Sequence, residues 1–249
     1  MIKKRIIPVM TYNGMSLIKT KQFDKPRMVG NPIQAARVYN ARNVDELAFI
    51  DIYATKQNRK INIELVKLIL NECFMPVSVG GGISTLSDIR DLLHAGADKV
   101  IIKNSAIYHP EFIEEAVLTF GSQCIVIAVD AIFDGKRYKI YNSQGLDITL
   151  EEFVVKMHKL NVGEFLITSV NHEGMMNGFD INLARIMYNL TDKPNIIHGG
   201  AGNPQNFLEL FNQVNISAAA AASIFHFTQY TPKDIKDLLK QNNIPVRNV

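Results

Sequence analysis

Two glycine-rich segments, each followed further along the chain by a hydroxyl residue, are the first residues whose types and spacing suggest chemistry. Gly80-Gly81-Gly82 precedes Asn104-Ser105, and Gly199-Gly200-Ala201-Gly202 precedes Ser223. Glycines let backbone N–H groups approach an anion closely, and a following helix N-terminus adds a favourable dipole. One such segment could be only a tight turn, but two at equivalent positions favour a ligand with a phosphate at each end. The residues assigned to phosphate or substrate binding on this pattern are Gly81, Gly82, Asn104, Ser105, Gly200, Gly202 and Ser223.

Two aspartates at the ends of apolar runs are candidates for acid–base chemistry or substrate binding. Asp130 follows Cys124–Val129, and a carboxylate at such a strand end can exchange protons with a substrate. Its alternative role is to cap the next loop. Asp51 is the second candidate, assigned to the substrate site, and its alternative role is to orient other groups.

The segment Thr11–Asn31 is long for a connection without structure of its own, and such connections are uncommon unless they are functional. It carries four cations, among them Lys19, so we predict a mobile lid that closes over an anionic ligand. A disordered insertion with solvated lysines is the alternative. A second segment, Phe133–Gln144, has the pattern of a small hairpin beside the same site.

Four charged residues stand at or just before strand starts and predict an ion-pair layer at the opposite end of the fold. They are two cations, Arg5 and Lys99, and two carboxylates, Glu46 and Glu164. On pattern alone, a structural role in closing that end is favoured.

The elements that position these residues alternate between buried strand patterns and amphipathic helix patterns. The strand candidates are Arg5–Met10, Leu47–Ile52, Pro76–Val79, Lys99–Ile102, Cys124–Asp130, Glu164–Val170, Asn195–His198 and Ala218–Ala222. The helix candidates are Ile33–Arg42, Ile63–Glu72, Leu86–His94, Glu111–Phe120, Leu150–Leu160, Ile181–Leu190, Phe207–Gln213 and Pro232–Gln241. Eight strand–helix units predict a single (β/α)8 TIM-barrel domain over residues 1–249, with a doubly wound open sheet as the alternative.

The two halves of the chain resemble each other at an offset of about 119 residues, which favours the closed barrel. Val79–Gly82 corresponds to His198–Ala201, and Asn104 falls opposite Ser223. A repeated four-strand half closes into an eight-strand barrel with a two-fold half-barrel repeat. The same offset places Thr11 opposite Asp130, and a threonine cannot perform the same proton transfer near neutral pH.

The composition is that of an ordinary globular protein and excludes several classes. The 249 residues include 27 Lys and Arg against 24 Asp and Glu, and a net charge of +3 does not suggest nucleic-acid binding. Two cysteines, Cys73 and Cys124, make neither a disulfide framework nor a metal cluster, so we expect no metal and no cofactor. No apolar run approaches the ~18–20 residues of a membrane span, and Met1–Arg5 leads into a strand pattern, not a signal peptide. We therefore expect a cytoplasmic protein without a membrane partner.

The chain also resembles a known family, the cyclase subunit of imidazole glycerol phosphate synthase of the HisF type, essentially from end to end. The matching segments are Lys4–Pro8, Asp45–Leu47, Val79–Ile83, Phe120–Gln123, Asp130, Gly199–Gly202 and Ala222–Phe227. The resemblance implies the same barrel with half-barrel duplication. It also assigns Lys19, Gly174 and Ala222 to the substrate site.

The resemblance implies a lyase/cyclase activity in histidine biosynthesis. A glutaminase subunit of the HisH type, docked at the barrel bottom, supplies ammonia that passes through the barrel to a bisphosphate substrate at the top. There ammonia enters an imidazole ring as the ring closes, releasing imidazole glycerol phosphate and an aminoimidazole carboxamide ribotide. Asp98 matches a residue of the docking face. The residues that match the family's ammonia gate are Arg5, Glu46, Lys99 and Glu164.

Several positions depart from the family pattern. The catalytic pair of the family is two aspartates, of which Asp130 matches the second while Thr11 stands at the first. An Asn-Thr pair is replaced by Lys103-Asn104-Ser105, a serine by His198, and Asp-Arg-Asp-Gly-Thr by Asn171–Met175. Loss of one member of an acid–base pair typically costs about 10²–10⁴ in rate.

The departures leave two alternatives to the cyclase. The chain also looks like a paralogue that supplies ammonia for acetamidino-sugar formation in lipopolysaccharide and other surface-polysaccharide biosynthesis, which Pro26–Ile33 and Glu72–Pro76 resemble. The second alternative is a non-catalytic barrel that only activates a glutaminase.

Overall fold

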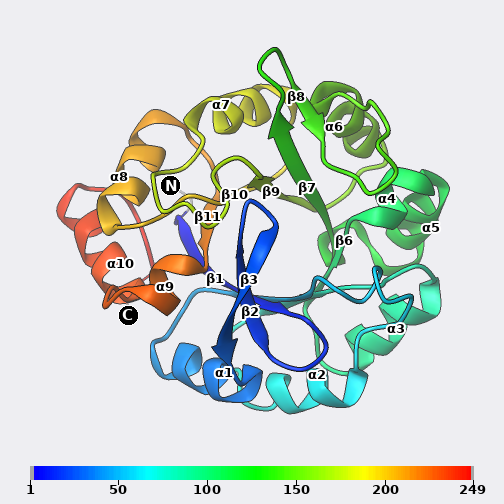
Figure 1. Ribbon diagram of the computed structural model, residues 1–249, viewed down its shortest axis with the longest axis horizontal. Helices are drawn as coiled ribbons and strands as arrows, with labels where there is room; N and C mark the ends of the chain where they lie inside the picture. Colours follow the sequence, from blue (N-terminus) through cyan, green and yellow to red (C-terminus); the bar gives the residue numbers. More distant parts are fainter. Residues whose placement is uncertain (1–2, 248–249) are drawn as a thin grey trace.

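The structure, a computed structural model, describes residues 3–247 and contains a closed barrel of eight parallel strands (Figure 1). β11 pairs with β1, with Ala218 opposite Arg5, and this pairing closes the sheet. The TIM barrel predicted from the sequence is therefore confirmed, and the open sheet is wrong. Met1 and Ile2, and both ends of the predicted domain, lie outside the described residues. The barrel strands are β1 (Arg5–Tyr12), β4 (Leu47–Asp51), β5 (Val77–Gly80), β6 (Lys99–Ile102), β7 (Ile125–Phe133), β9 (Glu164–Ser169), β10 (Asn195–His198) and β11 (Ala218–Ala221).

Eight helices surround the barrel, one for each predicted helix. They are α1 (Pro32–Ala41), α2 (Ile63–Leu70), α3 (Leu86–His94), α5 (Pro110–Phe120), α6 (Leu150–Lys159), α7 (Ile181–Leu190), α8 (Pro204–Gln213) and α10 (Pro232–Gln241). Polar caps fix their starts: the Asn31 side chain accepts from the first turn of α1, and Thr85 and Asp88 form a reciprocal capping box on α3. No helix of residues 3–247 is long and apolar enough to cross a membrane.

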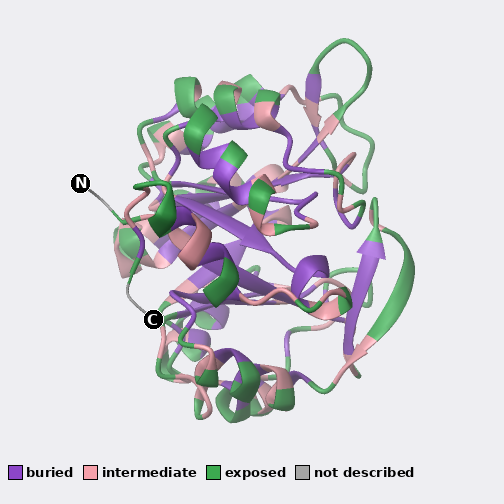
Figure 2. Cartoon of the chain, turned by 90° about the vertical axis from the view of Figure 1, so that its left-hand side faces the viewer, coloured by how far each residue is buried: buried purple, intermediate pink, exposed green. Residues whose placement is uncertain are grey.

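The buried residues form two layers. The larger layer lies between the strands and the helices, whose outer faces are exposed (Figure 2). The smaller layer fills the barrel interior, and β11 contributes only alanines to it, Ala218 and Ala220. These alanines are smaller than the branched residues that dominate the interior of most such barrels.

Two hairpins extend the barrel at its C-terminal face and correct two predictions. β2 (Leu17–Lys21) and β3 (Asp24–Gly30) pair in antiparallel fashion, so the segment predicted as a mobile lid without structure of its own contains a hairpin that crosses the barrel mouth (Figure 1). β7 continues beyond Asp130, where the sequence predicted its end, because its last residues pair with β8 (Tyr138–Ile140). The hairpin predicted over Phe133–Gln144 is thereby confirmed.

The half-barrel repeat is visible in elements that the sequence did not predict. Two short helices, α4 (Asn104–Tyr108) and α9 (Ser223–Phe227), begin 119 residues apart, and a one-turn helix, η1 (Ser122–Cys124), precedes β7. The two hairpins likewise follow β1 and β7, the first strands of the two halves. Equivalent segments of the two halves are thus placed at the same end of the barrel.

Candidate functional site

The carboxylate of Asp130 lies in the barrel mouth and forms an ion pair with a lysine from the neighbouring strand end. Asp130 Oδ2 and Lys103 Nζ are 2.6 Å apart, and 13% of the Asp130 side chain is exposed. β6 and β7 are adjacent parallel strands, with Ile102 opposite Ile127, so residues just beyond β6 and late in β7 share the mouth. The strand-end position predicted for Asp130 thus puts it in contact with a second titratable group.

Lys103 departs from the family pattern but was not among the predicted site residues. Its place in the strand alternation could have identified it. Side chains alternate between the two faces of a strand, and Ile101 of β6 points into the barrel. Lys103 stands two residues later, so it falls on the same interior face at the level of the mouth.

Two aromatic rings cover the Lys103 ammonium group. Lys103 Nζ is 5.8 Å from the ring centre of Phe23 and 5.4 Å from that of Tyr141. The two rings contact each other edge to face, with centres 5.4 Å apart. Phe23 is in the turn of the β2–β3 hairpin and Tyr141 follows β8, so both hairpins meet above the ion pair.

Thr11, the repeat counterpart of Asp130, is engaged elsewhere. Its hydroxyl donates a hydrogen bond to the carbonyl oxygen of Ile18 on β2. The hydroxyl therefore ties the base of the hairpin to β1, and its proton is committed to that bond.

The hairpin is held across the mouth by a buried ion pair between Lys19 of β2 and Glu173 of the loop after β9. Their side chains are 4% and 1% exposed. Glu173 also accepts hydrogen bonds from the Thr20 hydroxyl at 3.1 Å and the Phe23 backbone N–H at 3.2 Å. Burial lowers the pKa of Lys19 to about 8, and the touching carboxylate acts in the opposite direction. We call this ion pair the latch of the hairpin.

The other cations of the hairpin point away from this latch. Lys21 and Lys25 are exposed, and the Arg27 guanidinium lies 4.1 Å from the ring centre of Phe227 on α9. This stacking is a cation–π contact that joins the far strand of the hairpin to the barrel wall. Only Lys19 of the four turns into the site.

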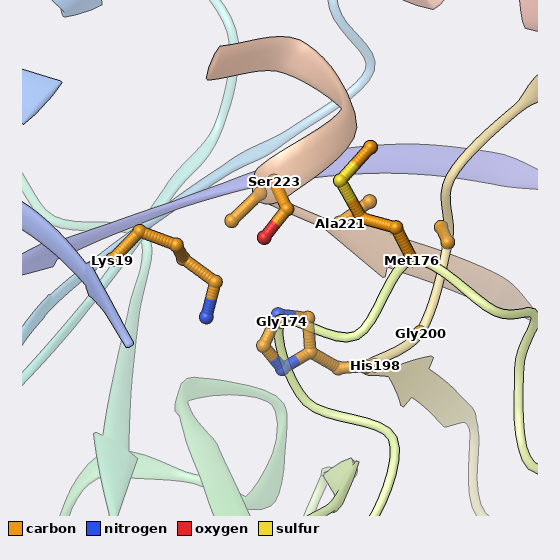
Figure 3. A pocket seen from close by; sticks show the side chains of 10 residues that line it. Lys19, Gly174, Met176, His198, Gly200, Ala221 and Ser223 are labelled. Atoms are coloured by element: carbon orange, nitrogen blue, oxygen red, sulfur yellow. The ribbon is translucent and has the colours of Figure 1, made fainter. Parts of the chain in front are cut away.

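A pocket beside the latch gathers the predicted phosphate residues of the second half-barrel (Figure 3). Lys19, His198 and Ser223 point toward one another from β2, β10 and the start of α9. At Gly200, φ is +101°, and a Cβ atom there would overlap the carbonyl oxygen of Gly178. This position therefore requires glycine. The remaining lining residues are Gly174, Met176, Gly199, Ala201, Ala221 and Ala222. Gly202 follows this lining and precedes α8.

His198 lines this pocket as a neutral imidazole. Burial, together with the positive charge of Lys19, lowers its pKa to about 3. Its Nδ1 lies 3.1 Å from the Thr168 hydroxyl oxygen, which fixes the ring orientation. A neutral, oriented ring can donate or accept one hydrogen bond at the pocket wall.

The predicted phosphate residues of the first half-barrel lie after β5 and β6. Gly81 and Gly82 follow β5 directly, and Asn104 begins α4. The Ser105 hydroxyl donates to the carbonyl oxygen of Ile83 at 2.6 Å, which ties α4 to the β5 loop. These residues are brought to the same end of the barrel as the pocket in Figure 3.

Asp51 ends β4 and is fully engaged by its own loop. Its carboxylate accepts from the backbone N–H groups of Tyr53 and Ala54 at 3.1 and 3.0 Å. Arg59 makes two further bonds to it, at 2.5 and 3.0 Å. Its observed contacts are those of a group that orients a loop.

At the opposite end of the barrel, the four charged residues form a closed ring of ion pairs. Arg5 contacts Glu46 at 2.7 Å and also Glu164. Lys99 contacts the same two carboxylates at 2.9 and 2.8 Å. Burial opposes the charge of Glu46, but Lys99 and Arg5 outweigh it and hold its pKa below the usual value. The predicted ion-pair layer is confirmed.

Asp98 lies at the same end, immediately before β6. Its carboxylate accepts from the Val77 N–H at 2.8 Å, and its own N–H donates to the Val77 carbonyl oxygen at 3.0 Å. This places Asp98 at the rim around the charged ring. Within residues 3–247, no group of three or more His, Cys, Asp and Glu side chains is arranged to hold a metal ion.

Comparison with known proteins decides the family. A family model described as "Histidine biosynthesis protein" matches residues 5–231. The chain belongs to this family. Within it, the chain is 40% identical to the imidazole glycerol phosphate synthase subunit HisF of Staphylococcus epidermidis over 252 aligned positions, which cover 99% of this chain and all of that protein. The HisF subunits of Staphylococcus aureus and Staphylococcus saprophyticus are 40% and 41% identical over the same shares.

This similarity bears on the alternatives raised by the sequence. The relatives carry the name of the cyclase subunit, and they match the chain over its length instead of one half or one motif. The histidine-biosynthesis cyclase is therefore supported, and the amidino-sugar paralogue and the non-catalytic barrel are not favoured.

Proposed function

We propose that this chain is the cyclase subunit of an imidazole glycerol phosphate synthase. It takes ammonia from a glutaminase partner and incorporates it into a phosphorylated substrate at the barrel mouth. The observation that carries the proposal is that the two ends of one barrel each hold a distinct polar site. A carboxylate and an anion pocket lie at one end, with a closed ring of charges at the other. The full-length similarity to HisF subunits supports the same conclusion.

In this proposal the substrate bridges the mouth with a phosphate at each end. Lys19, Gly200 and Ser223 hold one phosphate, in the pocket of Figure 3. Gly82 and Asn104 flank the site of the other. The Lys19 ammonium group then leaves Glu173 and pairs with the phosphate, so that one buried anion replaces another as its partner. The reacting centre between the two phosphates faces Asp130, which transfers protons during ring closure.

Ammonia reaches the mouth through the barrel interior. The inner layer of side chains between the charged ring and the mouth is rich in apolar residues, among them the small Ala48, Ala218 and Ala220. An uncharged molecule crosses such an interior without the large desolvation cost that an ammonium ion pays. The closed ring of Arg5 and its three partners must open for passage, and we assign it the role of gate.

The glutaminase partner docks at the end that carries the gate, and Asp98 on the rim is one of its contacts. The partner's active site then faces the ring directly, so that ammonia enters the barrel without release to solvent. We also propose that residues 1–249 form one cytoplasmic barrel domain. In this proposal the domain binds neither nucleic acid nor membrane and needs no cofactor or metal.

The test is product formation from the formimino bisphosphate intermediate of histidine synthesis by this chain mixed with a HisH-type glutaminase. Glutamine and ammonium chloride are compared as nitrogen sources. We expect product with both, and Asp130→Asn should lower both rates by about 10²–10⁴. Lys99→Met should change the ratio of the two rates, because the gate affects only the internal route. Lys67→Met, which alters an exposed lysine of α2, is the matched control.

A folded chain that yields no product from either nitrogen source contradicts the cyclase. If such a chain still stimulates glutamine hydrolysis by the partner, the non-catalytic alternative replaces it.

A further inference from the structure

Ring closure needs paired proton-transfer groups, and two of the carboxylates that the structure describes at the mouth besides Asp130, Asp51 and Glu173, are held by their own partners. Addition of ammonia to a double bond requires one group to accept a proton from nitrogen and another to donate a proton to the atom that receives the electron pair. Asp130 can perform the first task. The hydroxyl of Thr11, at the equivalent place in the other half-barrel, donates its hydrogen bond to the Ile18 carbonyl oxygen.

The other titratable groups around the mouth are already committed. Lys19 and Glu173 neutralise each other in a buried pair, which a bound phosphate would replace. His198 is held by Thr168 and lines the phosphate pocket. Among residues 3–247, Asp130 forms an ion pair with one residue, Lys103, through its ammonium group.

We propose that Lys103 is the proton donor that works with Asp130, in place of a second carboxylate. This inference rests on the proposed cyclase function and deepens it. Lys103 Nζ is 2.6 Å from Asp130 Oδ2, and 27% of the lysine side chain is exposed. Two groups at this distance can act on adjacent atoms of one substrate bond and can also exchange a proton with each other.

The proton balance of the addition step closes with these two residues. Ammonia attacks the carbon of a C=X bond, where X is oxygen or nitrogen, and the π electron pair moves to X. The Lys103 ammonium gives a proton to X, and the Asp130 carboxylate takes one from the new nitrogen. The product is C(NH2)(XH), with a neutral lysine and a protonated aspartate. Transfer of that proton from Asp130 to Lys103 restores the starting pair without another reactant.

The surroundings of Lys103 position it for this task. The rings of Phe23 and Tyr141 lie over its ammonium group and come from the two hairpins that meet above the mouth. Cation–π contacts orient an ammonium ion without removing its protons, because the ring face is not a proton acceptor in the manner of a carboxylate. The two hairpins therefore hold the donor beside Asp130.

The experiment compares ammonium-dependent turnover of the formimino bisphosphate by the wild-type chain with that of two Lys103 variants. Lys103→Met removes the charge and keeps the length of the side chain. Lys103→Arg keeps the charge and the stacking on the rings, but a guanidinium does not release its proton. We expect both variants to lower kcat by about 10²–10⁴ with little change in the KM of the bisphosphate. Lys67→Met, on the exposed face of α2, should keep the wild-type kcat, and thermal melting checks that each variant folds.

The outcomes separate this inference from the function on which it rests. A wild-type chain that turns over, with Lys103→Arg at the wild-type kcat, overturns the inference alone, since only the charge would then matter. A raised KM with unchanged kcat in both variants also overturns it, because Lys103 would then only bind substrate. A folded wild-type chain without turnover overturns the proposed function and the inference together.

Discussion

Removal of the Glu173 carboxylate should open the hairpin that covers the site. Glu173→Ala leaves the buried ammonium of Lys19 without its partner and also removes the acceptor for the Thr20 hydroxyl and the Phe23 N–H. Opening the hairpin returns these groups to water. The variant therefore penalises the closed state specifically.

The structure sets the size of the effect. Removing one partner of a buried ion pair costs about 3–5 kcal/mol. Contacts that remain are the Gln22 N–H to the Glu173 carbonyl oxygen at 2.9 Å and Arg27 on Phe227. We take the lower end, about 3 kcal/mol, which corresponds to a rise of about 100-fold in the open population. Glu173→Gln keeps an acceptor for Thr20 and Phe23 and should show a smaller rise.

Limited trypsin digestion measures that population, because cleavage follows the fraction of open molecules when closing is fast. Lys21 and Arg27 lie on the hairpin and are the sites to monitor by mass spectrometry. Cleavage there should accelerate about 100-fold in Glu173→Ala. Glu72→Ala is the matched control, since its pair with Arg37 lies at the surface, where ion pairs contribute little to stability. An unchanged rate at Lys21 in Glu173→Ala would refute the latch.

Three further predictions concern stability. Glu46→Gln leaves the two cations of the gate with one carboxylate and should lower the free energy of unfolding by up to about 3 kcal/mol in urea titration. His198 has its pKa lowered to about 3, so the unfolded chain binds its proton first. Stability should fall by up to about 1.4 kcal/mol per pH unit below about pH 6.5, and His198→Asn should reduce this slope in melting curves. Gly200→Ala and Gly135→Ala both place a side chain at positive φ, which costs about 1–3 kcal/mol. Of the two added methyl groups, only that at Gly200 also overlaps a backbone atom. Gly200→Ala should therefore lower the free energy of unfolding clearly more than Gly135→Ala in the same titration.

The barrel could be predicted because its strands are buried on both faces. Nearly continuous apolar runs, such as Ile125–Val129, predict such strands, and amphipathic patterns predict the helices between them. The hairpin strand Asp24–Gly30 escaped prediction because it is exposed along most of its length and contains Pro26, so it has neither an apolar run nor a clean alternation. Its structure depends on contacts with the barrel.

The candidate site likewise contains residues that the strand order predicts and contacts that it does not predict. Strand-end residues such as Asp130 and the charged ring followed from the barrel order, because parallel strands bring their equivalent ends together. The latch between Lys19 and Glu173 joins segments far apart in the chain, and nothing local to either residue encodes the other. The pairing of Asp130 with Lys103 can be predicted from the sequence, because β6 and β7 are neighbours and side chains alternate between the two faces of a strand.

Ammonium-dependent turnover of the formimino bisphosphate by the purified chain, without a glutaminase, tests the central claim most directly. With ¹⁵N-ammonium, we expect label in the imidazole ring of imidazole glycerol phosphate and release of the aminoimidazole carboxamide ribotide in equal amount. Absence of both products, from a chain shown to be folded and able to bind the bisphosphate, would contradict the assignment of this barrel as a cyclase.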